Sequence, residues 1–496
     1  MGLLELPVFA DEAIYIRWSQ LIIDDAGRYL FFPMNDGKTP LFFWLLAPFQ
    51  FVFSDQLFAA RFVSVLIGLA QMLVLMKITS VFTRNFKTIY LSGILVAIIP
   101  FWYFHHRMAL TDGLLTLLLS CSILFLVTEL TKQKSSSGSS VITLILSGVF
   151  FGLALLTKVP AILFAPSFFL LTMLIEKRTL QNLFLAVSKV VVVLGIGIAI
   201  FALLKFVPSF SQLFGRGSDF LLPLGEVLSG KWKETLPSLP VYVGYFAFYM
   251  TPTLFFLLLV GLFSKQNKSL VHIFFWSGVL FILPIGLLGK VVYARYLFPA
   301  AIYFTLASVF AIEDLFVFSK QFGSKLWHTF LVSGALVLLI SNSIANSGVF
   351  MVAAMTDHTK LPLVQSDVVQ YLTEWSSGHG LYEVSQLIKS ESKNKTIAVA
   401  TEGSFGSLPD GLTLYFHRRD VSNIYIDGVG FPVGGITQSF ANRAATFERK
   451  WLVVNSHRMN LNIDKKYLLR EYCRPFHAPC LQVWDITEVF DSLIVN

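Results

Sequence analysis

Residues 109–130 read ALTDGLLTLLLSCSILFLVTEL, an apolar run in which the only charged residues, Asp112 and Glu129, stand near the two ends. A helix needs about 20 consecutive apolar residues to cross the hydrocarbon core of a bilayer, so this run predicts a transmembrane helix. Comparable runs occur at about 58–83, 88–104, 141–157, 159–175, 184–206, 241–264, 269–288, 294–316 and 327–350. The sequence therefore predicts a polytopic α-helical membrane protein with about ten spans.

The composition agrees with this fold class. Of the 496 residues, 55% are hydrophobic and only 14% are charged, which is too apolar for a soluble protein of this size. The net charge of +8 could suggest nucleic acid as a partner. The positive residues fall in short clusters between the apolar runs, however, where the orientation of the chain in the membrane explains them, and we expect no nucleic-acid partner.

The connections between the runs alternate in charge. Lys and Arg occupy every second loop, at Arg84 and Lys87, Lys132 and Lys134, Lys177 and Arg178, Lys265 and Lys268, and Lys320 and Lys325. Because positive loops stay on the cytoplasmic side, these five loops are predicted to be cytoplasmic. The other connections, together with both termini, then lie outside, as in a multi-pass protein of the cell (cytoplasmic) membrane.

The N-terminus is anomalous in this topology, because no signal peptide or span precedes it to carry it outside. We interpret this as a first transmembrane helix that is missing from the chain or was never included in it. The alternative is that the next helix exports the short N-terminal segment.

Three domains follow from the runs and the composition. Residues 1–57 form an outer-face loop with an acidic pair and interfacial helices, and residues 58–350 form the transmembrane domain. Residues 351–496 are richer in Gly, Ser, Asp, His and Lys and contain β-rich runs at 396–400 and 451–454, which predicts an extracytoplasmic α/β domain. Cys473 and Cys480 could pair there in an oxidising compartment, or they could be two ordinary thiols.

The first chemical feature on the predicted outer face is Asp11-Glu12, followed by Tyr15. Asp11 could simply cap a helix, with Glu12 favourable to the helix dipole. The second feature is Lys38 in the segment Gly37-Lys38-Thr39-Pro40, a lone cation that could extend to the lipid headgroups or bind a phosphate at the membrane surface.

Three further outer segments carry polar residues. His106 and Arg107 precede Asp112, which could form an internal pair with Arg107. Lys158 follows one span, and Arg295-Tyr296 precedes the final helices. Each motif is weak alone, but the loop charges, assigned without reference to chemistry, put all of these residues on one membrane face, as a shared site would require.

These residues resemble those of the protein O-mannosyltransferase and aminoarabinose (ArnT-like) transferase superfamily, which are membrane glycosyltransferases of the GT-C type. The resemblance covers roughly residues 7–300. It rests on Asp11-Glu12 with Tyr15, Lys38-Thr39-Pro40 with Trp44, Arg107 with Asp112, Thr157-Lys158, and Arg295-Tyr296 with Pro299. One departure is Ile14, which stands where some aminoarabinose transferases carry arginine, so a specific aminoarabinose donor is not implied.

The resemblance implies inverting transfer of a sugar from a polyprenyl-phosphate-linked donor to an acceptor on the outer face. Asp11 would be the base and Glu12 would orient or assist it. The donor phosphate would bind Lys38, Arg295, Arg107 and Lys158, with Tyr15, Asp112, His106 and Tyr296 in supporting positions.

The sugar is expected to be mannose-like or another hexose or pentose. The acceptor is expected to be a lipid, a protein or a glycan, and the membrane lipids are a further partner. No metal-ligand spacing occurs, so we expect no metal site and no obligatory cofactor, while a divalent cation that assists the donor phosphate stays open. Two other functions compete with this interpretation. One is a polytopic lipid or sugar transporter or flippase, since charges within membranes also mark translocation pathways. The other is a noncatalytic glycan-binding membrane protein.

Overall fold

The computed structural model describes residues 2–131, 140–175, 178–321, 326–417 and 422–495. It divides into two compact units, each of which is described by itself. The first unit combines Met1–Tyr29, Phe43–Arg61 and Ala353–Asn496, and the second combines Leu30–Phe42 and Phe62–Val352. The domain boundaries that composition suggests stay predictions.

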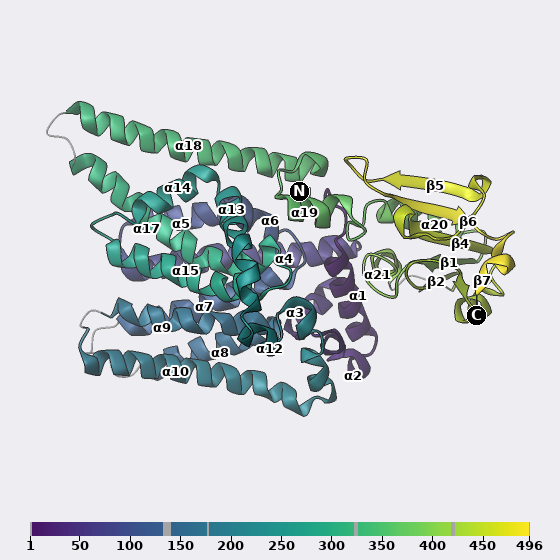
Figure 1. The fold of residues 1–496 in the computed structure, drawn as a ribbon, viewed down its shortest axis with the longest axis horizontal. Helices are drawn as coiled ribbons and strands as arrows, with labels where there is room; N and C mark the ends of the chain where they lie inside the picture. The colour runs from purple at the N-terminus through teal and green to yellow at the C-terminus, as the bar shows by residue number, and fades with distance from the viewer. Residues whose placement is uncertain (1, 132–139, 176–177, 322–325, 418–421, 496) are drawn as a thin grey trace. The chain divides into compact units, whose positions relative to one another are not determined.

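The first unit contains a five-stranded mixed sheet (Figure 1). Its strand order is β2-β1-β4-β6-β5. Strands β2, β1 and β4 pair in parallel, while β6 pairs antiparallel with both of its neighbours, β4 and β5. The strands are β1 (Ile397–Thr401), β2 (Ile424–Gly428), β4 (Arg449–Asn455), β5 (Leu468–Cys473) and β6 (Cys480–Asp485), with a separate small pair of β3 (Ile436–Thr437) and β7 (Ile494–Val495). Strand β1 is buried along its whole length, as expected for a central parallel strand covered on both faces. The two β-rich runs seen in the sequence are therefore strands β1 and β4.

Short helices accompany this sheet. They are α1 (Ala10–Asp24), α2 (Ala26–Tyr29), α19 (Gln365–Val368), α20 (Leu381–Glu391), α21 (Asp410–Thr413) and α22 (Gln438–Ala444), with single turns at η2 (Ala47–Phe51), η9 (His358–Lys360), η10 (Val369–Thr373), η11 (Leu414–Phe416), η12 (Ser456–Arg458), η13 (Lys465–Tyr467) and η14 (Phe490–Leu493). One core of the unit packs Phe440 of α22 and Phe490 with Leu452 and Val454 of β4 and Trp484 of β6.

The N-terminal segment is bound to the C-terminal part of the same unit by backbone hydrogen bonds. The N–H of Ala10 donates to the carbonyl of Ser376 at 2.9 Å, and the N–H of Gly378 donates to the carbonyl of Val8 at 2.8 Å. A side chain added at Gly378 would lie 2.4 Å from that carbonyl oxygen, so the close approach requires glycine. Residues far apart in the sequence thus fold as one unit.

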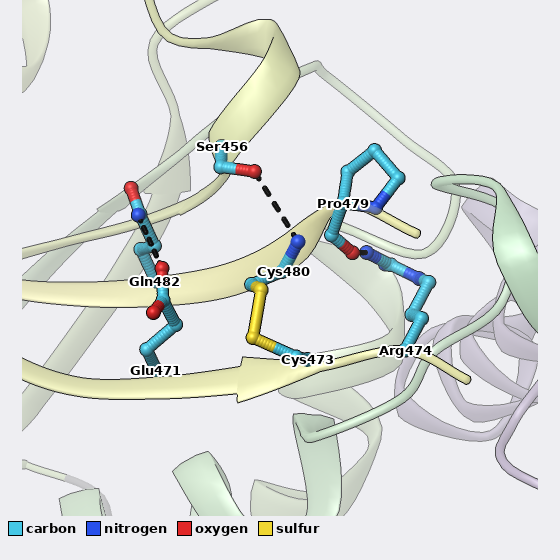
Figure 2. Close-up of a disulfide and its surroundings, with 7 residues drawn as sticks. All are labelled: Ser456, Glu471, Cys473, Arg474, Pro479, Cys480 and Gln482. Atoms are coloured by element: carbon cyan, nitrogen blue, oxygen red, sulfur yellow. Dashed lines mark hydrogen bonds between the residues drawn. A yellow bond between two sulfur atoms is a disulfide. The ribbon is translucent and has the colours of Figure 1, made fainter. Parts of the chain in front are cut away.

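Cys473 and Cys480 form a disulfide between the directly opposed ends of strands β5 and β6 (Figure 2). The backbone N–H of Cys480 donates to Ser456 Oγ at 3.2 Å, and Arg474 Nη1 donates to the carbonyl of Pro479 at 2.7 Å. Of the two alternatives that the spacing allowed, the structure shows the paired one.

The second unit is helical. Its elements are η1 (Phe32–Asp36), α3 (Leu41–Leu46), α4 (Gln56–Phe82), α5 (Phe86–Ile98), α6 (Pro100–His105), α7 (Thr111–Thr131), α8 (Ser140–Thr157), η3 (Val159–Phe164), α9 (Ala165–Leu171), η4 (Thr172–Leu174), α10 (Leu180–Ala202), η5 (Leu203–Phe206), η6 (Pro208–Phe214), α11 (Gly217–Phe220), α12 (Leu224–Leu228), η7 (Lys231–Ser238), α13 (Leu239–Tyr249), α14 (Pro252–Gly261), α15 (Lys268–Leu288), α16 (Ala294–Leu297), η8 (Phe298–Ala300), α17 (Ala301–Gln321) and α18 (Leu326–Thr356). The ends of α3, α4 and α18 lie in the first unit.

Helix α8 packs between α7 and α10 (Figure 1). Gly148 and Gly152, one turn apart on α8, face Ile196 and Ile200 of α10. A Cβ at Gly148 would lie 2.6 Å from Ile196 Cβ, and one at Gly152 would lie 2.8 Å from Ile200 Cβ. Small residues at this spacing let two apolar helices approach closely where the hydrophobic effect gives no drive for association.

Six helices of the described residues are long and apolar enough to cross a membrane, or seven if one bent pair is counted as a span. The six lie within Gln56–Phe82, Thr111–Thr131, Leu180–Phe206, Lys268–Leu288, Ala294–Ser319 and Phe330–Thr356. The fold class is confirmed, but the number of long helices is smaller than the predicted ten.

Proline explains most of the difference. The run at 241–264 is broken between α13 and α14, which meet at 109° just before Pro252. The run at 88–104 is divided before Pro100, and the run at 159–175 contains Pro160 and Pro166 and begins as a 3-10 helix. Proline lacks the N–H that continues the hydrogen-bond ladder and clashes with the preceding turn, so an apolar run can be long without being one helix. The predicted cytoplasmic loops at Lys132 and Lys134, at Lys177 and at Lys325 lie outside the described residues.

Candidate active site

The acidic pair lies in the first turn of α1 in the first unit. Glu12 is fully buried and Asp11 is half-buried. Glu12 Oε2 accepts a hydrogen bond from the backbone N–H of Phe9 at 3.0 Å, and Phe9 is the residue that precedes the helix. The capping role that the sequence allowed for Asp11 thus belongs to Glu12, while both carboxylates are favourably placed at the positive end of the helix dipole.

Arg61, which is not among the predicted site residues, binds Glu12. Its Nε lies 2.9 Å from Glu12 Oε1 and its Nη2 lies 2.6 Å from Glu12 Oε2, a two-point pair with both side chains almost wholly buried. The same guanidinium donates to the carbonyls of Leu3 at 2.6 Å, Leu6 at 2.7 Å and Pro7 at 3.0 Å. Arg61 therefore fixes both the segment before α1 and the first turn that carries Asp11.

Tyr15 lies one turn further along α1 and is buried. Its ring meets Phe43 edge-on at 5.1 Å, and Trp18 packs against the same Phe43 at 5.5 Å. These aromatic contacts hold α1 against the segment at Phe43.

Four of the predicted site residues come together in the second unit. Lys158 Nζ donates to Asp112 Oδ1 at 2.7 Å and lies 5.0 Å from the centre of the Tyr296 ring. The guanidinium carbon of Arg295 lies 5.3 Å from the same ring centre. Two cations thus flank one tyrosine ring, and Asp112 partly balances their charge, which is an arrangement suited to an anion such as a phosphate.

Asp112 is paired with Lys158, so the structure does not follow the alternative in which Asp112 pairs with Arg107. Arg107 donates to the hydroxyl of Tyr103 at 2.8 Å and lies 4.9 Å over its ring. Lys38 is paired with Asp36, which also binds Arg216, and Arg216 Nε lies 3.1 Å from Asp219. Arg107 and Lys38 therefore have partners other than the Lys158 group.

The two adjacent histidines are buried between aromatic rings. His106 stacks on Trp102 at 5.6 Å, while His105 lies 4.7 Å from Phe298 and close enough to Arg295 and Lys158 for electrostatic interaction. Gly68 makes room for His106, because a Cβ there would lie 2.8 Å from the histidine Cβ. His106 was the predicted supporting residue, but His105 lies nearer the cations.

The glycine-rich turn after β1 is structural. Gly403 and Gly406 have φ angles of +75° and +118°, which favour glycine. Glu402 is buried and accepts hydrogen bonds from Asn455 Nδ2 at 2.6 Å and Arg458 Nη1 at 3.0 Å. The turn is therefore tied to the end of β4.

Asp410 follows this turn, and the pKa of its carboxyl differs from the ordinary value. Burial raises the pKa of its carboxyl to about 6, against the opposing effect of the Gly406 N–H that donates to Oδ2 at 2.8 Å. Arg17 of α1 also lowers this pKa. The carboxyl thus changes protonation near neutral pH.

One group of metal-ligating residue types is compact enough among the described residues to hold an ion, namely Glu471 with Cys473 and Cys480. Because the two sulfurs are joined in a disulfide, they are not thiolates and do not fit a zinc site.

Asp11, Glu12 and Tyr15 belong to the first unit, and Lys38, Arg107, Asp112, Lys158, Arg295, Tyr296 and His106 belong to the second. The structure brings Asp112, Lys158, Arg295 and Tyr296 together. How the acidic pair participates with them stays a prediction.

Comparison with known proteins bears on this arrangement. A family model described as dolichyl-phosphate-mannose-protein mannosyltransferase matches residues 37–204. A comparison with curated proteins found no match.

Solved structures are similar over the whole chain. Apo ArnT from Cupriavidus metallidurans matches with a TM-score of 0.56 and 15% identity, covering 100% of this chain and 96% of that chain. ArnT bound to undecaprenyl phosphate matches with a TM-score of 0.57 and 14% identity over 98% and 96% of the two chains. The apo oligosaccharyltransferase of Archaeoglobus fulgidus matches with a TM-score of 0.54 and 12% identity over 91% of this chain and 66% of that one.

The chain therefore has the fold of the GT-C membrane glycosyltransferases, with a small strand-containing region at its C-terminal end. Within that class, the resemblance to the protein O-mannosyltransferase and aminoarabinose transferase superfamily, stated from the sequence, is confirmed.

Proposed function

We propose that this chain is a membrane glycosyltransferase that moves a sugar from a polyprenyl-phosphate carrier to an acceptor on the outer face of the cytoplasmic membrane. The observation that carries the proposal is the group of Asp112, Lys158, Arg295 and Tyr296. Asp112 lies in the first turn of α7, Lys158 directly follows α8, and Arg295 and Tyr296 lie in α16. The two cations of this group suit a phosphate. The likeness to ArnT, whose structure was solved with undecaprenyl phosphate, supports this choice of carrier.

In the proposed reaction Asp11 accepts the proton of an acceptor hydroxyl while the oxygen of that hydroxyl attacks the anomeric carbon of the sugar. The bond from that carbon to the phosphate oxygen breaks on the opposite face, and its electron pair leaves with the lipid phosphate, so the configuration inverts. Lys158 and Arg295 stabilise the negative charge on the leaving phosphate, and Lys38 and Arg107 extend this binding. Asp112 positions Lys158, and Arg61 positions Glu12 and the turn that carries Asp11.

The first test compares sugar transfer from a panel of radiolabelled polyprenyl-phosphate sugars by the wild type and by Asp11→Asn. Transfer that survives Asp11→Asn at equal expression removes Asp11 as the base. Lys38→Ala should weaken donor use chiefly through binding, so an unchanged dependence on donor concentration removes Lys38 from the phosphate site.

A second test addresses the phosphate group with a matched control. Lys189 pairs with Glu129 at 2.8 Å, and this pair is as buried as the pair of Lys158 with Asp112. Lys158→Met should lower transfer roughly 100-fold, and Lys189→Met should leave it near the wild-type rate. Equal losses in both variants would mean that Lys158 contributes only to the membrane fold.

One feature favours the transporter as a second candidate. The bent pair α13 and α14 is a broken apolar helix, as transporters often have at their binding sites. Among the described residues it is the one such pair, whereas an inverted repeat would supply two. If a labelled lipid crosses the membrane of vesicles that contain the protein, and no sugar is transferred, the result would support the transporter.

A further inference from the structure

The first unit contains a cavity of about 230 Å³ that is open to solvent, and none of the residues discussed above lines it. Three stretches of chain line it, and they contribute Ser54, Asp55, Gln56, Tyr382, Gln386, Lys389, Tyr415 and His417. This volume is somewhat below the roughly 300–1,000 Å³ of pockets that enclose drug-sized ligands, so the cavity suits a part of a ligand the size of a single ring.

Helix α20 forms one wall. Tyr382, Gln386 and Lys389 are spaced at i, i+4 and i+7, so they share one face of the helix, while Val384 and Ile388 on another face are buried. Tyr382 is half exposed. An exposed polar stripe with an aromatic ring is thus held on a helix whose other side is fixed by the core.

The second wall is formed by Tyr415 of η11 and by His417, which directly follows it. The rings of Tyr415 and Tyr382 meet edge-on, with their centres 5.7 Å apart. Lys389 Nζ lies 5.7 Å from the centre of the Tyr415 ring. His417 Nε2 lies 2.9 Å from Asp24 Oδ1, so this histidine is oriented by a carboxylate.

The third wall is the start of α4, the first helix of the chain that is long and apolar enough to cross a membrane. Asp55 Oδ1 accepts a hydrogen bond from the backbone N–H of Phe58 at 2.8 Å and so caps this helix. Gln56 Nε2 donates to the carbonyl of Phe53 at 3.3 Å, while its Oε1 is shielded from solvent without a hydrogen-bond partner among the described residues.

The chemistry of the lining selects the ligand. The described lining carries one carboxylate, on Asp55, and one ammonium, on Lys389, and His417 is paired with Asp24, so the charges of the lining offset one another rather than favour an anion. Amides, hydroxyls, a carboxylate and an ammonium provide both donors and acceptors. The tyrosine rings provide apolar faces beside them. A sugar ring has the complementary pattern, with apolar C–H faces and hydroxyls around its edge.

We propose that this cavity binds one neutral sugar ring of a glycan. This inference rests on the proposed function and deepens it, because it names the acceptor as a molecule that carries a glycan. The bound ring would be a part of that acceptor that does not react. The cavity would then determine which acceptor glycans are used.

The test measures saccharide binding to the full-length protein in nanodiscs without any donor, by saturation-transfer NMR and calorimetry. The probes are neutral monosaccharides and disaccharides, with inorganic phosphate as the anionic comparison. We expect a saccharide to bind and Tyr382→Ala to weaken that binding roughly tenfold. Lys389→Gln should also weaken it.

The matched control is Lys466→Gln. Lys466 likewise lies over a tyrosine ring, that of Tyr467 at 4.8 Å, but it does not line the cavity. This variant should bind like the wild type. The inference is overturned if no saccharide binds, if Tyr382→Ala binds as well as the wild type, or if phosphate displaces the sugar.

The outcome is separable from that of the proposed function. Saccharide binding through Tyr382 in a protein that transfers no sugar from any donor would refute the transferase and keep the binding site. Asp11-dependent transfer in a protein without saccharide binding would keep the transferase and refute the binding site.

Discussion

Replacing Arg61 by methionine should be among the most damaging single changes in the first unit. The substitution removes the two-point partner of Glu12 and the donor to the carbonyls of Leu3, Leu6 and Pro7. Breaking a buried pair by removal of one member leaves an uncompensated charge and costs about 3–5 kcal/mol.

The predicted loss is large enough to measure. For a unit of about 190 residues it corresponds to a fall of roughly 6–20 °C in the thermal midpoint. Glu12→Gln should cost less, because Arg61 keeps its three carbonyl partners. The double variant should be less damaged than the sum of the two single changes, by about 1–3 kcal/mol, because no buried carboxylate is then left unpaired.

The assay is thermal unfolding of the detergent-solubilised protein, followed by tryptophan fluorescence for the wild type, the two single variants and the double variant. Arg470→Met is the control, since this arginine is exposed on β5. A midpoint for Arg61→Met within roughly 2 °C of the control would refute the reasoning. Strictly additive losses in the double variant would show that the two side chains do not act as a pair.

Three further predictions concern the first unit and the topology. Burial raises the pKa of Asp410 from an ordinary value of 3.8 to about 6, so between these pH values the folded protein keeps a proton that the unfolded chain releases. The stability of the folded state should therefore fall as pH rises from 3.8 to about 6. Asp410→Asn should remove this fall in thermal unfolding scans. Reduction of the Cys473–Cys480 disulfide, which closes a short loop, should cost about 2–3 kcal/mol, and equal midpoints with and without reductant would contradict this. Lys466→Cys should react with a membrane-impermeant maleimide in intact cells and Arg84→Cys only after permeabilisation, whereas the reverse pattern would invert the topology.

The fold class could be predicted from the sequence because membrane spans are local features. The run at 109–130 needs no distant contact to be identified, since its length and apolarity suffice. The breaks at Pro100 and Pro252 were missed for a related reason. Hydropathy averages the apolarity of the residues in a window, so it does not register that a proline lacks a backbone N–H. The disulfide stayed undecided because spacing alone does not determine which strands a pair of cysteines joins.

The candidate site was predictable as a set of residues but not as contacts. Lys158 and Asp112 are far apart in the sequence, and nothing local indicates that they pair. Arg61 was missed because it stands at the start of a predicted span and reads as a flanking charge. An arginine inside an apolar run is costly unless it is paired, so this position could have prompted a search for its acid. His105 and His106 are adjacent in the sequence, and the fold distinguishes them by placing His105 within electrostatic reach of Arg295 and Lys158.

The construction of the first unit from three separate stretches has a consequence for biogenesis. The hydrogen bonds at Val8 and Ala10 need partners near residue 377, which a ribosome working at about 5–20 residues per second makes roughly 20–70 s later. During that interval the membrane helices are inserted while α1 waits without its C-terminal partners. A chain truncated after the last membrane helix should therefore still insert, yet its acidic pair would stand on a helix that has lost these contacts, and quality-control proteases should degrade it faster than the full-length chain.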